Sequence, residues 1–177
     1  HLRPLLKYLN QFGLHIYDAQ LINVHGGSLR VYVRHERQKL TKRCEDIIKN
    51  ERSWFLTEVR KFKSNVVHNK ENTIRLLNTL KQEGRKISIL GYPAKACTLS
   101  YYYGLDKKLI DNVYDDNTLK IGKTTHKGFV VKPTAEIYND KPDYLFICSW
   151  NYATELMKRF ADTGCKFIIP FPEPRIV

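Results

Sequence analysis

The sequence has few of the features that define a protein class at once. Its 177 residues include only 4 cysteines, Cys44, Cys97, Cys148 and Cys165, and no two of them form a C-x-x-C pair. They are therefore expected to be ordinary small core residues. No apolar run approaches the roughly 20 residues that span a bilayer, and the first residues lack a signal-peptide pattern. These absences predict a soluble, cytoplasmic protein.

Common catalytic motifs are also missing. The chain contains no H-E-x-x-H zinc motif, no P-loop, no clustered His and Cys residues, and no Ser, His and Asp set at a recognisable spacing. Metal-dependent hydrolysis, P-loop nucleotide hydrolysis and triad chemistry are therefore not indicated. No residue stands out as a general base.

Positive charge is plentiful and unevenly distributed. The chain carries 30 Lys and Arg against 18 Asp and Glu, and residues 34–86 alone hold 15 Lys and Arg against 7 Asp and Glu. This excess favours an anionic partner, which could be a phosphate-bearing small molecule, a nucleic acid or an acidic protein surface. A basic helix that only faces solvent would give the same count, so charge alone does not choose.

The first 35 residues predict one helix and two strands. Leucines recur at helical spacing over residues 2–12, with Gly13 as a C-terminal cap, and residues 14–22 and 28–34 are rich in Ile, Val and Tyr. A helix and two strands cannot bury both faces of a sheet. Residues 1–35 are therefore expected to be the end of a larger domain.

A helical connector and then alternating strands and helices follow. Residues 36–83 carry apolar side chains at helical intervals, with a break near residues 49–53. Beyond them, strands are predicted at 86–90, 112–114, 129–131, 144–148 and 166–170, and helices at 95–103, from 133 and at 152–163. Crossover helices join parallel strands, so residues 84–177 are predicted to form a three-layer α/β domain with a mainly parallel sheet.

Ligands bind open parallel sheets at the carboxyl ends of the strands, so the residues after each strand are candidates. Lys95 and Thr98 begin the helix after the strand at 86–90, where they could hold a phosphate or form a plain turn. Asp115 could accept a ribose hydroxyl or close a turn. Asn151 could contact a ligand or cap the following helix.

The glycine turn between the first two strands is another candidate. Gly26 and Gly27 allow close approach of a ligand to the backbone, and His25, Ser28 and Arg30 could contact anionic oxygens. A histidine in a hairpin turn can equally be structural.

The tyrosines at 101–103, close to Lys107 and Lys108, could stack nucleic-acid bases beside phosphate contacts. Consecutive residues of a helix point in different directions, however, so core packing with a polar tip is the preferred explanation.

Four segments carry a recognisable pattern: V-H-G-G-S-L-R-V-Y-V (24–33), P-A-K-x-x-T-L (93–99), P-D-Y-L-x-x-x-x-W-N (142–151) and K-F-I-x-P-x-P-E-P (166–174). Their order resembles that of the C-terminal part of SAM-dependent nucleotide-sugar C-methyltransferases. The resemblance implies that residues 1–35 end a SAM-binding domain and that residues 84–177 are a Rossmann-like C-terminal domain. The SAM motif, the zinc cysteines and the catalytic segment of the family would then lie upstream, so SAM is expected to bind the full-length protein and not this chain.

The resemblance also implies where the substrate binds. In this family the substrate lies between the central and C-terminal domains, which suits the glycine-turn cluster as well as Lys95, Thr98 and Asn151. One departure matters: the family's turn G-Y-G-A-x-A-K is two residues shorter here, G-Y-P-A-K, and Pro93 lacks an N–H donor. Phosphate binding at this helix start is therefore expected to be weakened or lost.

The leading hypothesis is the substrate-side part of a SAM-dependent C-methyltransferase acting on a nucleotide-linked deoxysugar, inactive by itself. Its expected partners are the nucleotide sugar and the upstream methyltransferase domain, with no membrane and no nucleic acid. The first alternative is a non-catalytic basic module that binds a nucleotide or RNA. The second is a family member whose C-terminal domain serves only structure or assembly.

Overall fold

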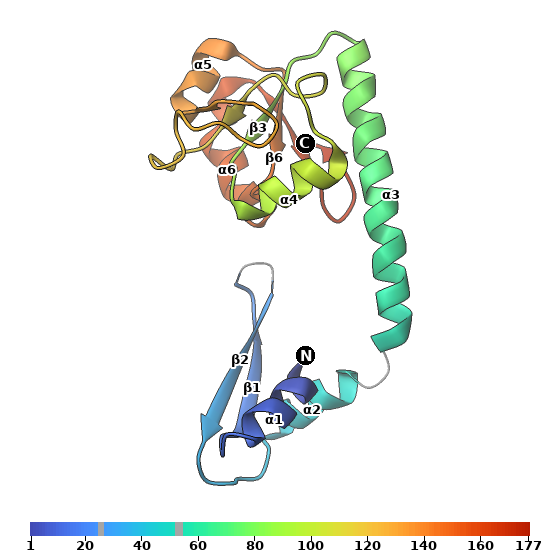
Figure 1. The fold of residues 1–177 in the computed structure, drawn as a ribbon, viewed down its shortest axis with the longest axis vertical. Helices are drawn as coiled ribbons and strands as arrows, with labels where there is room; N and C mark the ends of the chain where they lie inside the picture. Colours follow the sequence, from blue (N-terminus) through green and yellow to red (C-terminus); the bar gives the residue numbers. More distant parts are fainter. Residues whose placement is uncertain (25–26, 52–54) are drawn as a thin grey trace. The chain divides into compact units, whose positions relative to one another are not determined.

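The computed structural model describes the whole chain except residues 25–26 and 52–54, and its packing divides the chain into two compact units, His1–Ser64 and Asn65–Val177 (Figure 1). Helix α3 (Phe55–Gln82) contributes its first part to one unit and its last part to the other. None of the described helices is long and apolar enough to cross a membrane. The expected division of the chain into the end of a SAM-binding domain (1–35), a helical connector (36–83) and a C-terminal domain (84–177) stays a prediction.

The first unit packs two helices against a β-hairpin. In chain order its elements are α1 (Leu2–Asn10), β1 (His15–Ile22), β2 (Ser28–Arg34) and α2 (Lys42–Asn50). The strands pair antiparallel with one irregularity between Ile16 and Asp18, so the strands predicted at 14–22 and 28–34 are confirmed to within one residue. One stripe of α1 and the inner side of α2 pack on the hairpin. The buried core consists of Leu2, Ile16, Ala19 and Cys44.

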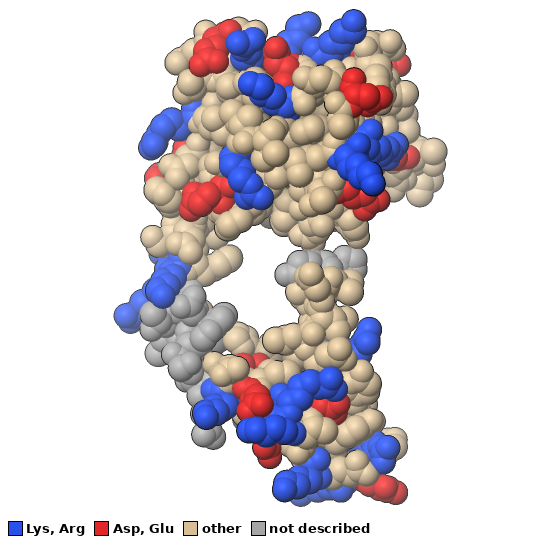
Figure 2. Space-filling view, turned by 180° about the vertical axis from the view of Figure 1, so that it is seen from behind, with Lys and Arg blue, Asp and Glu red and all other residues tan. Residues whose placement is uncertain are grey.

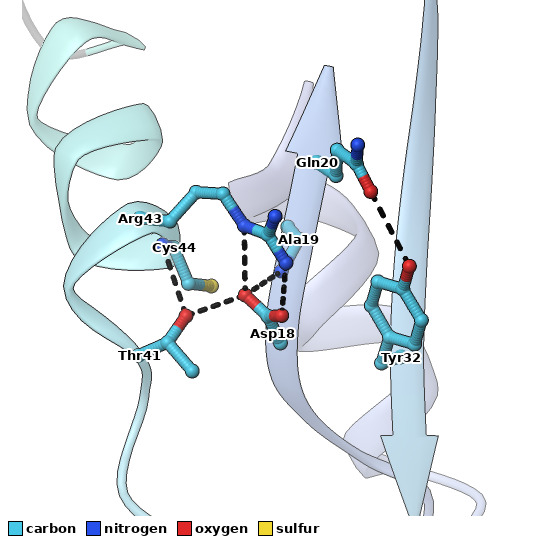
Figure 3. A network of polar contacts seen from close by, with 7 residues as sticks. All are labelled: Asp18, Ala19, Gln20, Tyr32, Thr41, Arg43 and Cys44. Carbon is cyan, nitrogen blue, oxygen red and sulfur yellow. Dashed lines mark hydrogen bonds and ion pairs between the residues drawn. The ribbon is translucent and has the colours of Figure 1, made fainter. Parts of the chain in front are cut away.

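A polar network around Asp18 fastens α2 to β1 (Figure 3). The Asp18 carboxylate accepts hydrogen bonds from the Thr41 hydroxyl, from the Arg43 guanidinium and from the backbone N–H of Ala19, the last at 2.8 Å. Thr41 also caps α2, because its hydroxyl oxygen accepts from the backbone N–H of Cys44 at 3.3 Å. The hydrogen bonds from Arg43 and Thr41 lower the pKa of Asp18, despite partial burial. One carboxylate thus joins the hairpin to the start of α2.

The second unit is built on a six-stranded sheet with the order β5-β4-β3-β6-β7-β8. The strands are β3 (Ile87–Leu90), β4 (Val113–Tyr114), β5 (Val131–Lys132), β6 (Tyr144–Ile147), β7 (Lys166–Ile169) and β8 (Arg175–Ile176). The first five in this spatial order run parallel, and β8 is antiparallel to β7. The prediction of a mixed α/β domain with a mainly parallel sheet is therefore confirmed.

Helices cover both faces of this sheet (Figure 1). The last part of α3 and helix α4 (Ala94–Tyr103) pack on one face, and α5 (Ile137–Asp140) and α6 (Ala153–Arg159) pack on the other. All residues of β3 and β6 are buried, as expected of strands that are covered on both sides. The apolar stripe of α3 continues into this core through Leu77 and Leu80.

Two details differ from the sequence-based expectation. The helix predicted over 152–163 is wrong as one element, because the chain forms a 3₁₀ turn at Trp150–Tyr152, then α6, then a second 3₁₀ turn at Ala161–Thr163. The Thr163 hydroxyl donates to the Phe160 carbonyl at 2.6 Å and so occupies an acceptor that a longer helix would use. Strand β8 was not expected, since its two exposed residues carry no apolar pattern and are held by backbone pairing with β7.

The expectation that all four cysteines are core residues is wrong for two of them. Cys44 and Cys148 are buried, but Cys165 is half-buried and Cys97 is exposed. Helix α4 turns another stripe of side chains toward the sheet, which leaves Cys97 on its outer side. That buried stripe comprises Ala96, Leu99, Ser100 and Tyr103.

Buried Asn69 of α3 links three elements of the second unit. Its side-chain N–H₂ donates to the carbonyls of Pro170 at 2.7 Å and Pro172 at 2.8 Å, and its side-chain oxygen accepts from the Tyr103 hydroxyl. The same residue therefore holds the turn after β7 and the end of α4. Burial raises the pKa of Tyr103 to about 12, so this hydroxyl stays a donor over the whole physiological range.

We expect Asn69→Ala to lower the free energy of unfolding of the second unit by about 2 kcal/mol, because it leaves buried donors and acceptors without partners. Urea unfolding, followed through the amide NMR signals of β3 and β6, measures this change. The control is Asn78→Ala on the exposed side of the same helix, which should change stability by less than about 0.5 kcal/mol. Equal effects of the two substitutions would contradict the role of Asn69.

A second prediction concerns acid stability of the first unit. A lowered folded-state pKa means that Asp18 stabilises the folded unit above its unfolded-state pKa of about 3.9, and that this contribution is lost as the pH falls through the lowered folded value. Asp18→Asn should therefore destabilise the unit at pH 7, with a difference from the parent that shrinks below about pH 4. Thermal unfolding at several pH values, with a carbon NMR titration of the Asp18 carboxyl, tests it. The exposed ion pair of Lys42 and Asp46 offers Asp46→Asn as the control, and a titration midpoint above about 3.9 would refute the prediction.

Candidate functional site

The order of the strands creates a turning point between β3 and β6. From β3 the chain proceeds outward to β4 and β5, and then returns to place β6 on the other side of β3. The connections after β3 and β6 therefore leave in opposite directions, which opens a crevice at the carboxyl edge of the sheet. A hollow of about 250 Å³ lies there. It is lined by Leu90, Gly91, Asp115, Asp116, Thr134, Ser149, Tyr152, Glu155 and Leu156.

Gly91 and Ser149 meet at the centre of this edge. Gly91 has φ +77°, and a Cβ on it would lie 2.5 Å from the Ser149 Oγ. The left-handed backbone favours glycine, and an added Cβ would also force the Ser149 side chain to shift, because it would lie 3.3 Å from the Ser149 Cβ. The space that a ligand would use beside a glycine-rich turn is already occupied by the Ser149 side chain.

Asp115, a predicted site residue, holds the turns around the crevice. Its Oδ2 accepts the backbone N–H of Tyr92 at 2.7 Å and the Lys120 ammonium at 3.1 Å, and its Oδ1 accepts the N–H of Asn117 at 2.8 Å. Lys120 also donates to the Tyr92 carbonyl at 2.9 Å. The turn role that the sequence left open for Asp115 is therefore realised, while its buried carboxylate still lines the hollow.

Asp116 lines the same hollow and is more exposed than Asp115. It accepts from the Thr134 hydroxyl and from Arg159 Nη1 at 2.5 Å. Burial alone would raise the pKa of Asp116, but these two donors lower it below its ordinary value. Because Glu155 lines the same hollow, the lining is acidic and suits hydroxyl or amino groups better than phosphate.

Lys95 lies on the α4 side of the same edge. Its ammonium is 4.0 Å from the centroid of the Trp150 ring, and Trp150 in turn packs edge-on against Phe171 at 4.6 Å between centroids. Burial lowers the pKa of Lys95. The aromatic pair thus holds a partly desolvated cation at the carboxyl edge, where it can bind an anionic group.

The other predicted residues are distributed as follows. Thr98 is exposed on α4, and Asn151 is exposed in the middle of the 3₁₀ turn, where it does not act as the expected N-cap.

In the first unit, the Ser28 hydroxyl donates to the Val24 carbonyl at 2.9 Å, Gly27 has φ +118°, and Arg30 is exposed on β2. His25 and Gly26 lie outside the described residues. Within the second unit, the fold therefore brings Lys95 and Asp115 to one edge.

Ser149 and Trp150 were not chosen from the sequence, and neither were Thr134, Tyr152 and Glu155. The rule that ligands lie after the strands would have pointed to Ser149 and Trp150, which directly follow β6. Only the tertiary contact with Lys95 shows that the Trp150 ring holds a cation at this edge.

The three tyrosines differ in exposure and contacts, although the rings of Tyr102 and Tyr103 lie 5.8 Å apart between centroids. Tyr103 is buried, Tyr102 carries the Lys70 ammonium 4.6 Å from its ring centroid, and Tyr101 is 73% exposed. They therefore do not form one stacking platform. On the face shown in Figure 2, Lys and Arg side chains are interspersed with acidic ones over the described residues.

The described residues do not fit a resident SAM or metal. The turn after β3 contains a single glycine, Gly91, and the Ser149 side chain occupies the space beside it. Helix α4 starts from Pro93, which provides no side-chain cap. Among the described residues no group of three or more His, Cys, Asp or Glu could hold a metal ion.

Substitution by alanine should destabilise the protein more at Gly91, in the crevice, than at Gly104. Gly104 has φ +72° with open space where a Cβ would lie, so Gly104→Ala should cost only about 1 kcal/mol of backbone strain. Gly91→Ala adds the contact with Ser149 and should cost about 2–4 kcal/mol. Adding Ser149→Ala to Gly91→Ala should recover part of this loss but not the strain. Urea unfolding measures all three variants, and equal costs at the two glycines would contradict the close contact.

Comparison with known proteins identifies the family. Residues 23–172 match the model of the C-methyltransferase C-terminal domain. The chain is 26% identical to C-methyltransferase NovU of Streptomyces niveus over 185 aligned positions, which cover 99% of this chain and 44% of that protein. The chain thus spans less than half the length of this relative. Since the family model covers most of the sequence, including the crevice, the chain belongs to the C-methyltransferase C-terminal domain family.

Proposed function

We propose that this chain is the substrate-side part of a SAM-dependent C-methyltransferase that acts on a nucleotide-linked sugar. The observation that carries the proposal is the family match over residues 23–172, which includes both Lys95 and the acidic hollow. In such an enzyme SAM supplies the methyl group, and it would bind in a part of the protein outside this chain. The chain itself would hold the nucleotide and orient the sugar.

The geometry supports a division of labour within the second unit. Lys95 would bind an anionic oxygen of the ligand, because its ammonium is held on Trp150 and partly desolvated. The exposed carboxylates of Asp116 and Glu155 would accept hydroxyl groups of a sugar or ribose, and Asp115 would hold the turns around them. The short turn with Pro93 fits this division, since the phosphate would rely on the lysine rather than on backbone N–H groups.

We also propose that the second unit is Rossmann-like and that the first 35 residues come from the end of the SAM-binding domain. The spatial order β5-β4-β3-β6-β7-β8 corresponds to 3-2-1-4-5-6 within the sheet, which is the doubly wound order that binds nucleotides at its turning point. The two-stranded hairpin, with only two described helices packed on it in its unit, supports the second assignment.

A basic module that binds nucleotide or RNA is the second candidate. It is favoured by the net charge of +12, and by the Lys127 ammonium 5.7 Å from the ring of exposed Tyr101. It is weakened by the burial of Tyr103, which removes that ring from any stacking surface, and by the acidic lining of the hollow.

Ligand-detected NMR with a panel of nucleotide sugars, SAM and a short single-stranded RNA, at two salt concentrations, tests the proposal. We expect weak binding of sugar nucleotides and none of SAM. Lys95→Ala should weaken sugar-nucleotide binding by about tenfold, the loss of one charge-assisted hydrogen bond. Lys108→Ala, which removes an exposed lysine of the same unit, is the matched control. RNA binding that falls steeply with salt, without sugar-nucleotide binding, would favour the basic module instead.

A further inference from the structure

Cys97 and His126 form a thiol–imidazole pair outside the crevice. All four cysteines are among the described residues, and Cys97 is the exposed one. Its Sγ lies 3.5 Å from Nδ1 of His126, which is hydrogen-bonding distance for sulfur. An exposed thiol next to an imidazole is the arrangement of an activated cysteine nucleophile.

The fold holds the imidazole in place against the thiol. His126 is at the tip of a turn closed by the Gly128 N–H donating to the Thr125 carbonyl at 2.9 Å. The Tyr92 hydroxyl lies 3.2 Å from His126 Nδ1, and the Tyr101 ring lies 6.0 Å from the imidazole between centroids. Cys97 and Tyr101 are one turn apart on α4, so His126 lies over that side of the helix.

We propose that Cys97 is a site of covalent modification that exchanges with small disulfides, with His126 as the proton acceptor. In the tautomer with hydrogen on Nε2, Nδ1 of His126 is an acceptor within reach of both Cys97 Sγ and the Tyr92 hydroxyl. It takes up the thiol proton when the Tyr92 hydroxyl donates to Ser100 instead. The Cys97 sulfur then attacks one sulfur of the disulfide, a new S–S bond forms, and the other sulfur leaves as a thiolate. The step consumes one disulfide and needs no other oxidant. This inference is independent of the proposed methyltransferase function.

The remaining cysteines provide internal comparisons. Burial raises the pKa of the Cys44 and Cys148 thiols, which keeps them protonated and inaccessible. The half-buried Cys165 donates from its Sγ to the Pro142 carbonyl at 2.9 Å, an acceptor that cannot take up a proton. The titratable and charged groups near Cys97 are Tyr92 from the turn before α4, Tyr101 from α4, and His126 and Lys127 from the loop.

The test is reaction of the folded chain with an aromatic disulfide such as dithiobis(nitrobenzoate), followed by peptide mapping. We expect Cys97 to react first, and Cys97→Ser to abolish the fast phase. His126→Gln should slow that phase by about tenfold at pH 7, the low end for general base catalysis, and by less than about twofold at pH 10, where hydroxide removes the proton. His68→Gln, an exposed histidine of α3 paired with Asn72, should leave the rate unchanged.

Unchanged thermal unfolding of the His126→Gln variant establishes that the loop is intact. A merely structural role for His126 would change the rate equally at both pH values, which would overturn the proposal. Reaction of Cys165 as fast as Cys97 would overturn it as well.

Discussion

The structure of the second unit depends on the burial of two short strands on both faces. Every residue of β3 and β6 is buried, so each strand requires a helical layer above and below it. Helical crossovers between parallel strands satisfy this requirement and bring the carboxyl ends of the strands to one edge. The crevice with Gly91 and Ser149 follows from that single constraint, because β3 and β6 are neighbours whose connections leave in opposite directions.

Several polar groups at this edge stabilise the fold rather than await a ligand. Asp115 is bound by two backbone N–H groups and by Lys120, which holds the turn after β3 against the turn after β4. Lys95 differs from it, since its ammonium lies over the face of Trp150, 4.0 Å from the ring centroid. A cation on an aromatic face keeps its N–H donors for another partner, whereas a carboxylate with three donors is largely satisfied. This contrast supports the proposal that Lys95 binds the anionic part of a ligand.

The two units use the same device at different places, a single polar side chain that joins elements distant in the sequence. Asp18 connects β1 to α2, and Asn69 connects α3 to α4 and to the turn after β7. Each is more than 20 residues from its remote partners, and each satisfies several hydrogen-bonding groups at once. Such residues constrain how helices lie on a sheet, which apolar contacts alone leave less specific.

The sequence by itself determined the kinds of element and their order. Local patterns are enough to recognise these elements: apolar runs such as ISIL and YLFI predict strands, the leucine spacing predicts α1, and glycines mark turns. The predicted strands lie within two residues of those observed. The tertiary structure alone decided which of the polar candidates meet. Asn69, Trp150 and His126 acquire their roles from partners 29 to 103 positions away or from the packing of a ring, and no local pattern encodes such contacts. Strand β8 and the broken helix at 150–163 were decided in the same way, since backbone pairing with β7 and the Thr163 hydroxyl outweigh weak local preferences.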